Sequence, residues 1–313
     1  MAAKDSFLAT IAILESCLGG ASLVDGPPNA TVQNAQARFL RQGLAVLVFS
    51  AMEAFVRERT AEVLVSFKRR VVAFSDLPEQ LQKAITIGAL DGIRFRLKLQ
   101  PAAAKVLWLS NAVKPIANAS SDISRLSEYS FGYSASNLTE DDVEEVLKAF
   151  GVEAPWQQIT SLVSRCGITV IDCKGKFVSI KERRHDAAHA LTANVLHPDL
   201  VDSIRAAKAI CMAFDLLVSN SCGLFNRQIG PGVAARSKMK HSDLKLVFMA
   251  PTGVPDEYKF VREPQPGSAP GSCIRKIVGM NAASDFGVRH ARLNNRHVIV
   301  HDSTGNAINW ISH

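Results

Sequence analysis

The chain lacks several patterns that identify common classes of protein. Its longest apolar run, Gly43 to Val56, has 14 residues and is interrupted by Ser50 and Glu53, whereas a membrane-spanning helix needs about 20 apolar residues. We therefore expect no membrane partner. The sequence also contains no GxxxxGK phosphate loop and no GxSxG nucleophile elbow. These absences argue against ATP-driven and serine-hydrolase chemistry.

The cysteines and the first residues both favour a cytoplasmic protein. None of the six cysteines belongs to a CxxC pair, so neither a zinc cage nor a disulfide framework is indicated and a reducing compartment fits best. The apolar FLATIAIL near the N-terminus is flanked by Asp5 and Glu15, which is unlike a secretory signal. It predicts an amphipathic helix instead.

Charge is distributed unevenly along the 313 residues. The net charge is +7, with 24 basic and 23 acidic residues in 1–226 and 12 basic and 6 acidic residues in 227–313. A basic C-terminal segment of this size is typical of contact with a polyanion such as nucleic acid. A basic surface that only maintains solubility is the alternative.

Helical periodicity predominates up to residue 226. Residues 32–69 predict one long helix, apolar nearly all round at 44–56 and hence central in the fold. The other helices that we expect lie at about 76–90, 101–118, 140–150, 155–166 and 198–222, with a loop at 122–137. The segment 168–176 is short and β-branched, and predicts either a strand or an extended linker.

After residue 226 the periodicity changes from helical to alternating. Strands are expected at 244–250, 257–263, 273–280 and 296–301, the last forming a hairpin around Asp302 to Asn306. The predicted fold is mainly α: a helical domain, residues 1–226, followed by a basic β-rich domain, residues 227–313.

The stretch KERRHDAAHALTANVLHP, Lys181 to Pro198, carries the strongest functional signal and has three interpretations. His185 and His189 share a helical face and could grip a metal, but Asp186 replaces the Glu of HExxH. The third ligand would have to come from His197, Asp199 or Asp202. Alternatively, the charged residues simply cover a solvated helix face.

The third interpretation is a resemblance. RRHDAAH resembles the R-x4-6-H motif of the HEPN family, with Arg184 and His189 as the pair, His185 in the polar position, and Arg183 giving a second register. The early helix around Glu53, and the segment VEEVLKAFGV through PWQQITSLV that precedes the motif, resemble the RiboL-PSP type of HEPN protein. The resemblance covers roughly residues 5–222.

This resemblance implies a helical bundle that dimerises and cleaves RNA as an endoribonuclease, with neither a metal nor another cofactor. Bacterial members commonly act as toxins or phage-defence effectors, so an antitoxin or other regulatory protein is an expected partner besides RNA. A catalytically silent HEPN dimer, acting as a nucleic-acid-binding or regulatory module, is the alternative.

The residues of the motif suit ribonuclease chemistry. RNA supplies its own nucleophile, the 2′-OH, so cleavage needs proton transfer and charge stabilisation. His189 is suited to general acid–base work and Arg184 to the charge of the phosphorane. His185 or Asp186 would orient His189 or hold the substrate. We also predict RNA contacts from Lys181 and Arg183, and from the tail residues Arg289, Arg292 and Arg296.

The spacing of the motif adds a structural constraint. Positions five apart on an ideal helix point roughly 140° from each other, so Arg184 and His189 cannot share one face. We therefore expect an irregular helix start at the motif, a pair assembled across a dimer, or both. On a regular helix His185 and His189 would stack. A second metal site, at His297 and His301 of the tail, is a minor alternative because Ile299 lies between them.

Overall fold

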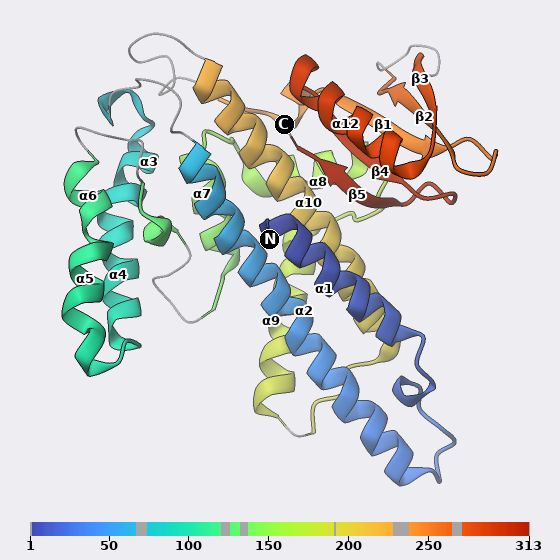
Figure 1. Cartoon of the computed structure of the whole chain (residues 1–313). Coiled ribbons are helices and arrows are strands. Elements are labelled where there is room, and N and C mark those ends of the chain that lie inside the picture. The colour runs from blue at the N-terminus through green and yellow to red at the C-terminus, as the bar shows by residue number, and fades with distance from the viewer. Residues whose placement is uncertain are drawn as a thin grey trace.

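The computed structural model describes residues 2–66, 74–119, 126–131, 137–190, 192–227, 238–264 and 271–312. Two long helices, α2 (Thr31–Ser66) and α10 (His197–Arg227), form the axis of a bundle. α1 (Ala3–Leu18), α7 (Glu140–Ala149), α8 (Pro155–Arg165) and α9 (Cys173–His189) pack around them (Figure 1). This helical domain confirms the predicted fold class.

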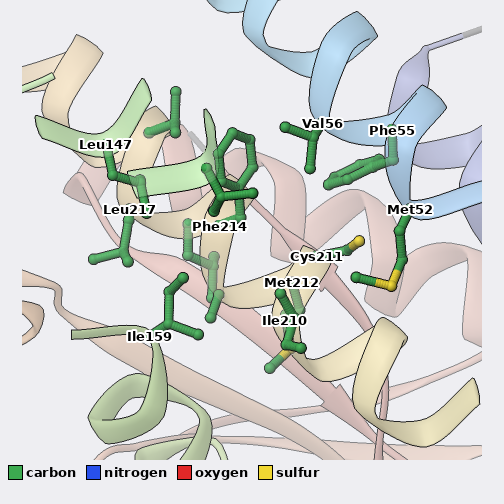
Figure 2. Close-up of a cluster of buried hydrophobic side chains, with 14 of the residues drawn as sticks. Met52, Phe55, Val56, Leu147, Ile159, Ile210, Cys211, Met212, Phe214 and Leu217 are labelled. Carbon is green, nitrogen blue, oxygen red and sulfur yellow. The ribbon is translucent and has the colours of Figure 1, made fainter. Parts of the chain in front are cut away.

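The centre of the bundle lies where α2 and α10 cross. Met52, Phe55 and Val56 of α2 are at most 2% exposed and lie beside Cys211 and Phe214 of α10, which are fully buried (Figure 2). The predicted central position of α2 is therefore confirmed. Both helices are long and apolar enough to pass a composition test for membrane spans, a test that core helices also pass; 83% of the apolar stretch of α10 and 44% of that of α2 are buried within the protein.

Local signals in the sequence account for the ends of α7 and α8. Thr139 and Asp142 form a capping box, in which each side chain accepts a bond from the other residue's backbone N–H. Gly151 follows α7 and Gly167 follows α8, each with φ of 79°. This left-handed conformation ends a helix and is least costly for glycine. Both predicted helices are confirmed.

An arm of shorter helices extends from the bundle. It contains α3 (Glu79–Lys83), the π-helical turn η4 (Ala84–Gly88), α4 (Ala89–Lys98), α5 (Lys105–Ala112) and α6 (Lys114–Asn118), with 3-10 turns η3 (Phe74–Asp76) and η5 (Ala102–Ala104). The helix predicted at 76–90 continues to Lys98, and Pro101 separates it from α5. Part of the predicted loop 122–137 is described, and contains the 3-10 turn η6 (Glu128–Ser130).

The C-terminal segment forms a five-stranded sheet in the order β3-β2-β1-β4-β5. The strands are β1 (Leu246–Pro251), β2 (Glu257–Arg262), β3 (Cys273–Val278), β4 (His297–His301) and β5 (Ala307–Ile311). β1 and β4 are parallel, and every other neighbouring pair is antiparallel. The predicted strands and the final hairpin are confirmed. α12 (Met280–Asn294) connects β3 to β4 and was not predicted.

The sheet is covered on both faces. Ile299, Ala307 and Trp310 belong to the same buried cluster as the bundle helices. Phe260 and Val298 point to the opposite face and pack under α12. The chain between Arg227 and Lys238, where we predicted the domain boundary, lies outside the described residues, and the boundary stays a prediction. One buried core therefore extends from the bundle into the sheet.

Candidate functional site

α9 carries the motif at its C-terminal end. Asp172 caps the helix by accepting a bond from the backbone N–H of Gly175 (2.9 Å), and Phe177 and Ile180 anchor it in the core. The strand or linker predicted at 168–176 is wrong from Cys173 onward, because this cap starts the helix there. The helix stays regular through His189 and closes with the Ala190 N–H bonded to the Asp186 carbonyl (2.8 Å). The irregular helix start expected at the motif is therefore also wrong.

The regular helix separates the two motif residues. The rings of His185 and His189 are in contact, with centroids 4.7 Å apart and planes tilted by 52° rather than stacked, and both rings and Asp186 are exposed. Arg184 is half-buried and lines a cavity of about 510 Å³, of which His189 is not a lining residue. The other lining residues are Phe49, Asn137, Thr139, Lys181, Glu182, His185 and Asp186. His185 and Asp186 thus connect the cavity to the exposed His189.

The two adjacent arginines differ in their partners. Arg183 donates to the Ser203 hydroxyl (3.1 Å) and to the Asp199 carboxylate (3.2 Å), which fixes the end of α9 to α10. Arg184 forms no hydrogen bond or ion pair with the part of the chain that the structure describes, and its Nε is buried. Because a guanidinium has five donors, Arg184 is equipped to bind an anion in this cavity.

The candidate third metal ligands beside the motif are engaged elsewhere. Asp199 binds Arg183, Asp202 pairs with Lys176, and the His197 Nε2 lies 3.1 Å from the Leu18 carbonyl oxygen. Across the described ranges, no group of three His, Cys, Asp or Glu side chains is placed to hold an ion. The residues of the motif therefore have no third metal ligand beside them within the described ranges.

A model of the RiboL-PSP-HEPN family matches residues 21–220, more than half of the chain. The chain belongs to this family. Comparisons with curated proteins and with solved structures gave no significant match. The match spans α2 through most of α10, and so contains the cavity and the motif. HEPN membership supports a nuclease, RNA-related or nucleotide-binding role, in a family whose domains commonly bind RNA and dimerise.

The HEPN domain holds the loop after His189 with two buried side chains of α2. Gln42 Nε2 donates to the Ala193 carbonyl (2.6 Å), and Arg41 Nε donates to the Val195 carbonyl (2.6 Å). Arg41 also pairs with Asp25, at 3.2 Å. Sequence reasoning missed both positioning residues. The available signal was the position of Arg41 and Gln42 between the apolar pair Phe39–Leu40 and the apolar run that begins at Gly43, because a charged group that is buried in such a helix requires a partner.

Glu53 positions the cavity wall of the HEPN domain. Its carboxylate accepts the backbone N–H of Leu138 (2.7 Å) and pairs with Arg57 (2.9 Å), which places the neighbouring Thr139 opposite Arg184. The similarity of the Glu53 segment to the family thus coincides with a structural contact.

Lys181 is engaged in an ion pair beside the cavity. It pairs with Glu140 of α7, and the Lys181 hydrogen bond lowers the pKa of that carboxyl group. Lys181 and Arg183 therefore both hold ion pairs within the chain, and their predicted contact with RNA stays a prediction.

The predicted basic residues of the tail lie apart from the motif. Arg289 and Arg292 are exposed on α12 and Arg296 precedes β4, whereas the motif end of α9 is at the opposite end of the molecule (Figure 1). His297 is buried, and the His301 ring stacks on Phe248 with its Nε2 3.1 Å from the Cys166 carbonyl oxygen. The tail histidines thus have packing roles.

Proposed function

We propose that this HEPN protein is a metal-independent endoribonuclease. The observation that carries the proposal is an arginine, Arg184, that bonds to no residue in the described ranges and lies on the wall of a cavity that continues to an exposed His185–His189 pair. In the reaction, His189 removes the proton from the 2′-OH, whose oxygen attacks the adjacent phosphorus. Arg184 stabilises the charge on the phosphorane. A protonated histidine then supplies the proton to the departing 5′-oxygen, leaving a 2′,3′-cyclic phosphate and a 5′-OH.

The working pair is assembled between two copies of the chain. Since α9 is regular, Arg184 and His189 of one chain diverge by roughly 140°. A second copy, facing the first across a two-fold axis, would bring its own motif to the opposite side of the substrate. Each site of such a dimer then takes Arg184 from one copy and His189 from the other.

An exposed apolar stripe on α2 fits this dimer. It lies on the N-terminal half of the helix, on the side away from the buried Arg41, which binds the loop after His189. Phe39 and Leu47 of this stripe are 50% and 52% exposed, and a Cβ added at Gly43 would meet no atom within 4 Å. Its members are Val32, Phe39, Leu40, Gly43 and Leu47. Such an apolar surface favours burial against a partner, which in this proposal is a second copy of the chain.

The test of cleavage is incubation of purified protein with mixed RNAs in excess EDTA. The wild type should produce fragments ending in 2′,3′-cyclic phosphate, and the Arg184→Ala and His189→Ala variants should each lose on the order of 10²–10⁴ in rate. Lys174→Ala, on an exposed position of the same helix, is the control and should cleave normally. Cleavage that survives either motif substitution refutes the assignment.

Bacterial HEPN proteins suggest a biological setting, a cytoplasmic toxin or phage-defence effector restrained by a partner protein. Expression of the wild type would then arrest growth, and His189→Ala would relieve the arrest. RNA binding without cleavage by the wild type would instead support the silent HEPN dimer, acting as a nucleic-acid-binding or regulatory module.

A further inference from the structure

Charge is segregated along the C-terminal sheet. Lys245 precedes β1, Arg262 ends β2, Arg296 precedes β4, and Arg292 lies in the last turn of α12. The pairing of Leu246 with His297 and of Val247 with Arg262 places these strand ends together. We call Lys245, Arg262, Arg292 and Arg296 the basic end of the sheet.

Acidic residues gather at the other end and are bound there. Asp256 accepts the backbone N–H of Met280 at the start of α12 (3.2 Å), where a carboxylate also favours the helix dipole. Glu257 accepts the Thr252 hydroxyl (2.6 Å) and pairs with Lys276. Asp302 accepts bonds from Thr304 and Asn306 within the hairpin turn. These carboxylates are fixed at a distance from the basic end.

The basic end consequently keeps its charge. The carboxylate next to it, Glu263, is held by two hydrogen bonds from Arg165 of α8 (2.6 and 2.8 Å). In the described ranges of the chain, none of Lys245, Arg262, Arg292 and Arg296 forms an ion pair. None of these four cations is therefore neutralised by an ion pair with a described residue, although the carboxylates of Asp243 and Glu263 line the adjoining cavity. Unpaired cations close together repel one another, and a bound anion relieves that repulsion.

His290 lies near two of these cations, Arg296 and Arg262. Its ring stacks on Phe286 with centroids 5.5 Å apart, and its Nε2 is buried without a hydrogen-bond partner among the described residues. The pKa of His290 is lowered by burial and by the neighbouring charges of Arg296 and Arg262. The His290 imidazole, on α12, therefore lies in the positive electrostatic potential of Arg262 at the end of β2 and Arg296 before β4.

A cavity adjoins the basic end. Its volume is about 780 Å³; Lys245 and Arg296 line it from the sheet, Arg165 from α8 and His241 from the turn before β1. Two carboxylates also line it: Glu263 is held by Arg165, and Asp243 accepts the backbone N–H of Lys240. A sugar-phosphate segment fits a space of this size. Since the phosphate oxygens of nucleic acids accept bidentate bonds from arginine, the chemistry of the lining matches a polynucleotide backbone.

We infer that the basic end of the sheet binds the phosphate backbone of RNA at a site separate from the motif. The choice of RNA rests on the proposed function; the phosphate chemistry rests on the cluster itself. No base-reading groups are required, so binding is independent of sequence and weakens with salt. The surface holds the substrate, and its loss should raise KM while leaving kcat unchanged.

The experiment measures RNA binding by the full chain in the His189→Ala background, by fluorescence anisotropy of a labelled single-stranded RNA over a range of salt concentrations. The test variant adds Arg262→Glu and Arg292→Glu, both at exposed positions. It should bind about tenfold or more weakly, with the slope of log Kd against log salt reduced by about 2.

The matched control adds Arg94→Glu and Lys98→Glu, two exposed positions of α4, with the same change in net charge. It should keep the salt slope of the parent. Equal behaviour of test and control variants overturns the inference. If the glutamate variant unfolds on a thermal scan, Arg262→Gln with Arg292→Gln provides the same comparison.

Cleavage by the otherwise wild-type chain is recorded separately. RNA binding that depends on the basic end, in a protein that does not cleave, would support the inference and refute the proposed ribonuclease.

Discussion

Two clusters of charged side chains in this protein have opposite environments. In the first, Asp215 of α10 is fully buried and bonds to Arg59, to the Ser219 hydroxyl (2.8 Å) and to the indole N–H of Trp310 (2.6 Å). In the second, at the end of α9, His185, Asp186 and His189 are exposed, and Arg184 has no protein partner within the described ranges.

The two clusters differ in what their charged side chains do: those around Asp215 stabilise the fold, and those at the end of α9 are available to a substrate. Burial alone would raise the pKa of Asp215, but Arg59, Trp310 and Ser219 together hold it below its ordinary value. Such a saturated network stabilises the ionised form and joins α2, α10 and the C-terminal strand. In the α9 cluster the rings of His185 and His189 are exposed, and Arg184 bonds to no described residue, which makes these groups available to a substrate. Substitutions in the two clusters should therefore affect different properties.

The largest effect on stability is expected from Asp215→Ala. The change leaves the Arg59 charge without its buried partner, and removing one member of a buried pair costs about 3–5 kcal/mol in the free energy of unfolding. Chemical denaturation followed by circular dichroism measures the loss. His189→Ala is the control and should unfold like the wild type. A small effect of Asp215→Ala would show that the network is not a structural element.

A smaller effect is expected from Trp310→Phe. Phenylalanine keeps most of the packing beside Phe55 but removes the N–H that Asp215 accepts, and a buried acceptor without its donor costs about 1–3 kcal/mol. Denaturation midpoints of this variant and of Trp108→Phe, in the α5 arm, give the comparison. Equal midpoints would mean that the sheet is held to the bundle without this bond.

The smallest effects on stability are expected from Arg183→Ala and Arg184→Ala. Arg183 loses a partly exposed ion pair, which is worth about 1 kcal/mol or less, and Arg184 loses no bond to a residue that the structure describes. A thermal scan should therefore place both variants near the wild type, with Arg184→Ala the closer. If Arg184→Ala unfolds at a temperature well below that of Arg183→Ala, the Arg184 guanidinium stabilises the fold, and the contrast drawn between the two charged clusters is wrong.

Local signals made most of the helices and strands predictable. The capping box at Thr139 and the glycines after α7 and α8 set the helix ends through contacts within a few residues. The alternation of apolar and polar residues identified the strands. α12 escaped prediction because its buried face consists of Ala283, Gly287 and Ala291, small residues that give little hydrophobic periodicity. The start of α9 was missed because the β-branched run before it outweighed the Asp172 cap.

The candidate site was only partly predictable for a different reason. Arg184 and His189 lie in one short motif, so their residue types and spacing could be read directly. The clamp from Gln42 to Ala193 joins residues 151 positions apart, and the bond from Trp310 to Asp215 joins residues 95 apart. Contacts between elements that are distant in sequence depend on the packing of the whole bundle, which no local pattern specifies.

The most direct test of the central claim is a pair of heterodimers, purified through two different tags and assayed for RNA cleavage in EDTA. A dimer of Arg184→Ala with His189→Ala retains one intact composite site if the pair is shared between copies, and should cleave at about half the wild-type rate. A dimer of wild type with the double variant has no intact shared site and should be inactive. The reverse result, with activity only in the second heterodimer, would contradict the shared site, and inactivity of the wild type itself would contradict the ribonuclease.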